Sequence, residues 1–306
     1  GGGYTLTTDE LSYEAKAAPS FIETIVNIFP SNFVQPMSDA SMLQIIVIAL
    51  FFGFGILAAG KKAQPVADFV NGMSEVCIKI MHMIISIAPF GVFGLITPVV
   101  ATNGPDILLP LLKLILVAYL AMILHMVVVY SGMVKAIAKM GPLTFFKGQV
   151  RAMTFAFASA SSVGTLPINM ECSEKLGVRR EVSSFVLPLG ATINMDGTAI
   201  YQGVCAIFIA QVFGIDLTIG QQCVIVMTAV LSSIGTAGVP GSGMIMLAMV
   251  LQSVGLPVEG IALVAGVDRV LDMMRTVVNI TGDQSAAVCV DSLEKRKEAR
   301  QAAKAA

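Results

Sequence analysis

The sequence contains little charge and no tryptophan. Only 13% of its 306 residues are Asp, Glu, Lys or Arg, whereas 56% are hydrophobic. Soluble domains carry about 25% charged residues, so this composition is a poor match for a soluble protein. The net charge of −1 also excludes the strongly basic surface of a nucleic-acid-binding protein, and we expect no nucleic-acid partner.

Patterns typical of metal sites, disulfides and enzymes are missing as well. The five cysteines are odd in number, lack metal-ligand spacing and lie mostly in apolar segments, so we expect them to be small buried hydrophobic residues. The glycine-rich stretch GTAGVPGSG (235–243) lacks the Lys-Ser/Thr ending of a P-loop. His82 and His125 lie in apolar segments without a nearby acid, which argues against a serine protease built on Ser162. We therefore expect no enzyme activity.

Long apolar runs are what the sequence has instead. The stretches 41–60 and 107–132 are each long enough to cross a bilayer, which needs about 20 residues. Basic residues gather in separate groups, and an excess of Lys and Arg marks cytoplasmic loops. The sequence thus predicts an all-α, multi-pass membrane protein with a lipid bilayer around it and a cytoplasmic C-terminus. The groups are Lys61 and Lys62; Lys135, Lys139, Lys147 and Arg151; Lys175, Arg179 and Arg180; and Lys295, Arg296, Lys297, Arg300 and Lys304.

Two serine-rich breaks inside apolar segments repeat each other, SSVGTLP at 161–167 and SSIGTAGVP at 232–240. Basic groups flank 152–174 on both sides, so this segment must enter the membrane and turn back. Loops without Lys or Arg flank 221–254, which must do the same from the opposite face. If the two breaks were ordinary kinks in helices that cross the membrane, the two extra crossings would place one of the basic groups outside the cell. We therefore predict two oppositely oriented re-entrant helical hairpins, a feature of secondary transporters.

The last apolar segment carries a polar stripe. Six residues within 267–283 share one side of a helix because they are spaced 4, 3, 1, 3 and 4 apart. A charge at the bilayer centre costs about 2.5–3.5 kcal/mol, so the stripe predicts a shared polar interior. An internal ion pair would explain part of it, and bound cations would explain the rest. The six residues are Asp268, Asp272, Arg275, Thr276, Asn279 and Asp283.

A second polar break, LGATINMDGT (189–198), interrupts the preceding span. Gly190, Asn194 and Gly197 favour an unwound turn, which would free carbonyl oxygens beside the carboxylate of Asp196. Hard cations prefer such a shell of oxygen ligands. The break, together with NITGD at 279–283, predicts a cation site between the two segments.

Together, SSVGTLP, NMDGT, SSIGTAGVPG and DMMRTVVNITGD resemble the glutamate transporter family, the dicarboxylate/amino acid:cation (sodium) symporters, from about residue 20 to 295. The resemblance implies a sodium-coupled secondary active symporter of acidic amino acids, aspartate or glutamate, in the plasma or inner membrane. It also implies a homotrimer with an elevator mechanism. A proton-coupled dicarboxylate carrier and an ion channel on the same scaffold are alternatives. Proton-coupled relatives tend to lose the carboxylate that matches Asp283.

The resemblance divides the chain into a polar loop (1–20), scaffold or trimerisation helices (21–100), a transport domain (105–295) and a cytoplasmic tail (291–306). The transport domain would contain a first re-entrant hairpin (145–177), a broken helix (181–213), a second re-entrant hairpin (219–255) and a last helix (259–290). The family has three further helices before the region that matches 20–60. We therefore expect this chain to be the C-terminal portion of a longer protein, with those helices as partners.

Site roles are also implied by the resemblance. Arg275 is similar to the arginine that binds the substrate's side-chain carboxylate, Asp272 to the residue that binds its amino group, and Asp268 to the residue that orients the arginine. Ser162, Thr198, Val239, Gly243, Thr276 and Asn279 complete the implied substrate set. Sodium would bind at Gly190, Asn194, Asn279 and Asp283; at Thr192, Ser233, Ile234 and Thr236; and at Asn194 and Asp196, with Met195 between the sites. Ala160 and Met273 stand where the family usually carries a further arginine, and Arg269 is a nearby, off-face substitute.

Overall fold

A computed structural model describes residues 29–38, 42–86, 90, 93–94, 97, 108–234, 236, 238 and 241–305. Every regular element within these ranges is helical, and no strand occurs among them, which confirms the all-α prediction. The predicted polar loop at 1–20 lies outside the described residues. Val239, one of the implied substrate residues, also lies outside them.

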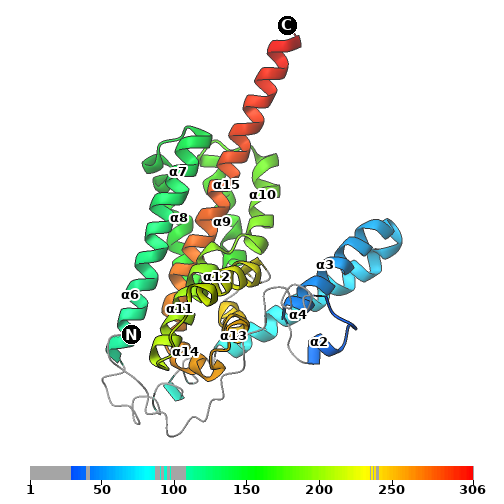
Figure 1. The fold of residues 1–306 in the computed structure, drawn as a ribbon. Coiled ribbons are helices and arrows are strands. Elements are labelled where there is room, and N and C mark those ends of the chain that lie inside the picture. Colours follow the sequence, from blue (N-terminus) through cyan, green and yellow to red (C-terminus); the bar gives the residue numbers. More distant parts are fainter. Residues whose placement is uncertain are drawn as a thin grey trace.

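Residues 108–305 form a bundle around one long helix, α15 (Asp268–Ala305), which Figure 1 shows in orange and red. Its buried side chains Leu271 and Val278 pack in the main apolar core, together with Ile209 and Leu247 from neighbouring helices. α15 packs against α6 (Leu108–His125), α8 (Pro142–Ser159), α9 (Ser162–Lys175), α10 (Arg180–Ile193) and α11 (Asp196–Val212). Two further helices, α12 (Ile219–Ile234) and α13 (Ser242–Ser253), pack on α11 and on each other.

Helices α3 (Met42–Ala59) and α4 (Gln64–Ser86) extend away from this bundle, joined by a short turn (Figure 1). The short helix α2 (Gln35–Ser38) packs on α3. Two helical stretches, Val47–Met73 and Leu108–Ala138, are long and apolar enough to cross a membrane. Large apolar side chains on their surfaces, such as Phe54 and Leu120, are exposed, as expected for groups that face lipid.

The two serine-rich breaks lie at the ends of two packed helix pairs, α8–α9 and α12–α13, and the two tips touch. Ser161 Oγ and the backbone N–H of Val163 both donate to the carbonyl oxygen of Gly238, each at 3.2 Å. Ala160 ends α8 in the left-handed region at φ 51°, and Ser161 begins α9 by accepting a hydrogen bond from Gly164 N–H at 3.0 Å. The depth of these pairs in a membrane stays a prediction.

The segment predicted as a broken helix at 181–213 contains α10 and α11, with Asn194 and Met195 between them. Gly190 and Gly197, which were also expected in the unwound turn, are helical. A short 3₁₀ turn (Val258–Gly260) and α14 (Ile261–Ala265) precede α15. α15 continues to Ala305, well beyond the predicted end at 290, and projects from the bundle (Figure 1).

The projecting part of α15 is tied to the loop between α9 and α10. Arg179 donates to both Asp291 and Glu298 at 2.7 Å, and Lys295 lies 2.6 Å from Asp291. Burial raises the pKa of Asp291, but the hydrogen bonds from Lys295 and Arg179 outweigh it, so the pKa lies below its ordinary value. The folded protein therefore holds this carboxylate in its charged form.

We predict that Asp291→Asn lowers the thermal unfolding midpoint in detergent, because it removes hydrogen bonds between charged groups worth about 1.5–3 kcal/mol each. A depressed pKa gives stability that is present above the unfolded pKa of about 3.9 and is lost as the pH falls through the folded value. The difference between the parent and Asp291→Asn should thus shrink below about pH 4. Glu294→Gln, which removes none of these bonds, is the control; equal midpoints for the two variants at pH 7 would contradict the assignment.

Candidate functional site

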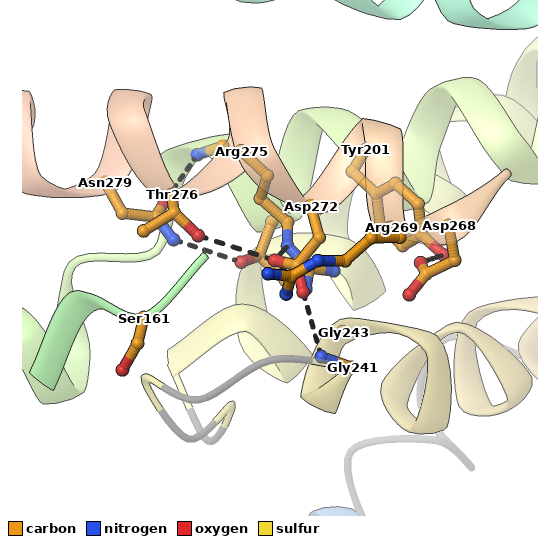
Figure 2. Close-up of polar contacts among 12 residues, drawn as sticks. Ser161, Tyr201, Gly241, Gly243, Asp268, Arg269, Asp272, Arg275, Thr276 and Asn279 are labelled. Carbon is orange, nitrogen blue, oxygen red and sulfur yellow. Dashed lines mark hydrogen bonds and ion pairs between the residues drawn. The ribbon is translucent and has the colours of Figure 1, made fainter. Parts of the chain in front are cut away.

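The polar stripe of α15 faces α11 and the two touching tips (Figure 2). All six of its members are nearly or fully buried, from 1% exposed for Asp283 to 6% for Asp268. A cavity between them is lined by Ser162, Thr198, Gly238, Asp272, Arg275, Thr276 and Asn279, with Ala160, Met195 and Ser242. The structure thus gathers most of the implied substrate residues around one small space.

Arg275 and Asp272 form a buried ion pair at the centre of this site. Arg275 donates through Nη2 at 2.6 Å and through Nε at 3.1 Å to the same oxygen of Asp272, and Thr276 Oγ1 lies 3.4 Å from that oxygen. The other Asp272 oxygen accepts from Gly241 N–H at the start of α13, at 2.9 Å. The remaining nitrogen of Arg275, Nη1, is buried without a hydrogen-bond partner among the described residues. This nitrogen lies against α13 at Gly243, so its N–H groups have no acceptor in the closed structure.

Gly243 allows this arrangement by having no side chain. A Cβ at this position would lie 1.7 Å from Arg275 Nη1, so the guanidinium lies directly against the backbone of α13. Gly243 thus contacts Arg275, and its role in substrate binding stays a prediction.

Asp268 acts on Arg275 through an intermediate residue. Its carboxylate accepts a hydrogen bond from Tyr201 Oη at 2.7 Å, and the Tyr201 ring lies 4.9 Å from the Arg275 guanidinium carbon, a cation–π contact. No direct ion pair joins Asp268 and Arg275 in the described structure. Sequence reasoning missed Tyr201, although its position on the same face of α11 as Thr198 was a usable signal.

Asn279 links α15 to the start of α11. Its Oδ1 accepts from the N–H of Gly197 at 2.8 Å, which satisfies one of the free amides that a helix N-terminus leaves. Its Nδ2 contacts Met195 Sδ at 3.1 Å and Thr198 Oγ1 at 3.4 Å. The cavity beside these groups has a volume of only about 10 Å³, room for about one water molecule. The site is closed in this structure.

Gln202, which the sequence did not single out, holds the second helix pair against α11. It accepts from Ser232 of α12 at 2.6 Å and lies 3.5 Å from the carbonyl oxygen of Gly243 on α13. One buried amide therefore contacts both arms of the pair.

The first implied sodium set is brought together. Asp283 accepts from Asn194 Nδ2 at 3.0 Å, and the same nitrogen lies 3.3 Å from the carbonyl oxygen of Asn279. A Cβ on Gly190 would lie 2.5 Å from Asp283 Oδ1, so the α10 backbone passes directly beside the carboxylate. Carboxylate and carbonyl oxygens suit a hard cation, and in this structure the amide nitrogen of Asn194 lies beside both of them.

The third implied set, Asn194 and Asp196, is separated into two environments. Asn194 faces Asp283, whereas Asp196 accepts from Tyr130 Oη at 2.9 Å and lies 3.2 Å from His125 Nε2. Tyr130 closes a π-helical turn, Met126–Tyr130, that follows α6. The expectation that His125 has no nearby acid was wrong, because Asp196 comes from a segment distant in sequence.

The second implied set lies at the tip of α12. Thr236 donates from N–H to the carbonyl oxygen of Ser233 and from Oγ1 to that of Ser232, both at 3.0 Å. A Cβ on Gly238 would lie 2.8 Å from the carbonyl oxygen of Ala191, which places the tip beside the end of α10, where Thr192 follows. Ile234 ends α12 with its side chain 45% exposed. No group of three or more His, Cys, Asp or Glu side chains that could hold a metal ion occurs in the described part of the chain.

Arg269 lies on the same helix but outside the ion-pair cluster. Its Nη2 is 3.3 Å from the carbonyl oxygen of Ala158 and 3.4 Å from that of Ser159, at the end of α8. This basic side chain therefore lies at the tip of the first helix pair, where the end of a helix favours a cation.

Comparison with known proteins gives consistent matches. The family model described as the sodium:dicarboxylate symporter family matches residues 3–293. A proton/sodium-glutamate symport protein of Bacillus caldotenax is 39% identical, covering 95% of this chain and 68% of the relative. A proton/glutamate-aspartate symporter of Escherichia coli (strain K12) is 36% identical over 98% of this chain and 68% of the relative. C4-dicarboxylate transport protein 1 of Ralstonia nicotianae is 38% identical over 92% of this chain and 66% of the relative.

We predict that Tyr201→Phe destabilises the protein by about 1–3 kcal/mol, because it leaves the buried Asp268 carboxylate without its hydroxyl partner. The measurement is the thermal unfolding midpoint of purified protein. Tyr119→Phe is the matched control, since it removes a tyrosine hydroxyl bond of 2.7 Å to the uncharged carbonyl of Val270. A smaller shift for Tyr201→Phe than for the control would argue against a charged Asp268.

Proposed function

Because the chain belongs to the sodium:dicarboxylate symporter family, we propose that it binds acidic amino acids and carries them across a membrane together with sodium ions. The family match over residues 3–293 confirms the family that the four motifs suggested. The observation that carries the substrate proposal is the free Nη1 of the buried Arg275. The relatives' names support glutamate or a dicarboxylate as the class of substrate.

The substrate's side-chain carboxylate would bind at Arg275. A guanidinium presents a planar fork that matches a carboxylate, so this residue would favour an acidic substrate over a neutral one. Asp272 would turn from Arg275 to the substrate's amino group. Ser162, Thr276 and Asn279, which line the same cavity, would hold the main-chain carboxylate.

Binding requires the closed pocket to open, because about 10 Å³ cannot hold an amino acid. The α12–α13 pair is the element that would move. It contributes Gly241 and Gly243 to the site, and Gln202 and the Gly238 contacts hold it in place. Opening would break these few hydrogen bonds and would leave the α15 stripe where it is.

Sodium would bind first between α10 and α15, at Asp283, where carboxylate and backbone oxygens converge. The set at the α12 tip would bind sodium with the pair closed, so cation binding would favour the closed, substrate-holding form. The Asn194 and Asp196 set would need a rearrangement that brings the two side chains together. An elevator movement, a homotrimer and a plasma or inner membrane location with a cytoplasmic C-terminus complete the proposal.

A C4-dicarboxylate carrier is the second candidate, because a relative with that name is 38% identical. Such a substrate has no amino group to pair with Asp272. Succinate competing better than L-aspartate would favour this candidate, and the reverse would favour the amino acid.

We predict that sodium raises the affinity for L-aspartate by about tenfold or more, since two ligands that favour one closed form must help each other to bind. Isothermal titration in sodium and in choline measures this. Asp283→Asn should weaken the sodium dependence of L-aspartate binding, because it removes one negative charge from a buried site of oxygen atoms. Asp216→Asn, which changes an exposed carboxylate, should leave that dependence unchanged. Equal affinities in sodium and choline for the parent protein would refute the coupling.

We predict that Arg275→Cys reverses the substrate preference. An acidic substrate would have to bury an unpaired carboxylate, which costs about 3–5 kcal/mol or two to three orders of magnitude in affinity. L-serine leaves no such charge and should be relatively favoured. Competition of L-aspartate against L-serine measures the preference, and Arg269→Cys, on the same helix, should keep that of the parent. If the folded Arg275→Cys protein still prefers L-aspartate, the assigned role of Arg275 is wrong.

A further inference from the structure

A column of buried polar side chains runs between α8, α9 and α15, beyond the candidate pocket. Gln149, Asn169, Ser173 and Gln284 are each at most 1% exposed. Gln149 Nε2 donates to Asn169 Oδ1 and to the carbonyl oxygen of Ile280, both at 3.1 Å, and Asn169 Nδ2 donates to the same carbonyl at 3.2 Å. This first layer joins all three helices.

The second layer contains Ser173 and Gln284. α9 and α15 run in the same direction, because Ser162 shares the pocket with Asn279, Asn169 meets Ile280, and the carbonyl of Gly177 meets Lys295 further along. Ser173 lies one turn beyond Asn169, and Gln284 one turn beyond Ile280. By this spacing we infer that the two side chains form the next level of the same interface.

These two layers hold almost all the unmatched polar atoms in the described structure. Five buried side-chain polar atoms lack a hydrogen-bond partner there. One is Arg275 Nη1, and the other four are Gln149 Oε1, Ser173 Oγ, and Gln284 Oε1 and Nε2. Native proteins rarely leave such groups unmatched, and ordered water commonly satisfies them. The set combines acceptors, an amide donor and a hydroxyl, so it fits water, which both donates and accepts, better than a bare cation.

We propose that this interface is a binding site for internal water, a hydrated column that extends from the candidate pocket toward the basic end of the bundle. At that end a cavity of about 420 Å³ is lined by Leu176, Gly177, Val288, Asp291 and Lys295, among others. A buried apolar cluster includes Phe145, Val178 and Val288, and the last two also line this cavity.

The column also has a use that rests on the proposed function. A cation that leaves its protein ligands must regain water, and Asp283 is the residue next to Gln284 in α15. Water held in the column would be available to a sodium ion that leaves toward the basic end. The apolar cluster would close this route until the helices move.

The sign of a stability change tests the water site without any transport assay. In a dry interface, Ser173→Ala and Gln284→Met remove unmatched polar atoms and should raise the thermal unfolding midpoint. In a hydrated column, both variants remove partners of bound water, and Gln284→Met strands Gln149 Oε1 and Ser173 Oγ. We expect Gln284→Met to lower the midpoint by about 3 °C or more and Ser173→Ala to lower it less. Gln252→Met, at an exposed position of α13, should cause no change. Unchanged or raised midpoints for both column variants would overturn the proposal.

A second measurement tests the exit role separately. In liposomes, Gln284→Met should slow sodium-driven L-aspartate uptake about tenfold or more while the dissociation constant for L-aspartate stays within about twofold. If Gln284→Met takes up L-aspartate as fast as the parent protein, the exit role is wrong. The stability measurement then still decides whether the column holds water. If the parent protein neither binds nor transports L-aspartate, the proposed function fails, and the stability result still decides whether the column holds water.

Discussion

The structure depends on one constraint, which is that α15 carries a charged stripe into an apolar bundle where water cannot satisfy it. Each buried carboxylate of the stripe has found a partner from another element or from the stripe itself. Asp268 accepts a hydrogen bond from Tyr201, and Asp283 accepts one from Asn194. Asp272 accepts hydrogen bonds from Gly241 and Arg275. Because an unmatched buried charge is costly, these contacts decide where the surrounding helices can lie.

Breaks in the helices supply the partners that the stripe requires. The interruption at Asn194 and Met195 turns the first amides of α11 toward Asn279 and brings α10 against Asp283. The start of α13 directs a backbone N–H at Asp272, where the positive end of a helix dipole suits a carboxylate. Glycines at 190 and 243 let backbone approach to distances that any side chain would prevent. Helix ends and absent side chains therefore shape this site as much as the charged residues do.

The sequence predicted the helical class, the polar stripe and the shared polar interior that brings its residues together. Both the periodicity of the polar residues and the cost of burying their charges can be judged from the sequence alone. Gln202 and Tyr130 carried no such signal, and Tyr201 was overlooked, since the partners of all three come from distant segments. The same reason explains the misjudged His125. The last helix was predicted to end at 290 because charge begins there, yet Glu, Lys, Arg and Ala favour helix, and it continues to Ala305. Arrangement in a membrane, assembly and ion selectivity depend on surroundings that one chain does not contain.

The length of α15 gives the molecule a mechanical property. As one helix of 38 residues it is a rod of about 57 Å, with the charged cluster near one end and a free polar end outside the bundle. A helix transmits a tilt or a slide along its axis with little loss, so a movement of the cluster is reproduced at the distal tip. Arg179 holds the rod at Asp291 and Glu298, in its second half, and would serve as the pivot. A spectroscopic label placed near residue 300 would therefore report displacements of the cluster without touching it.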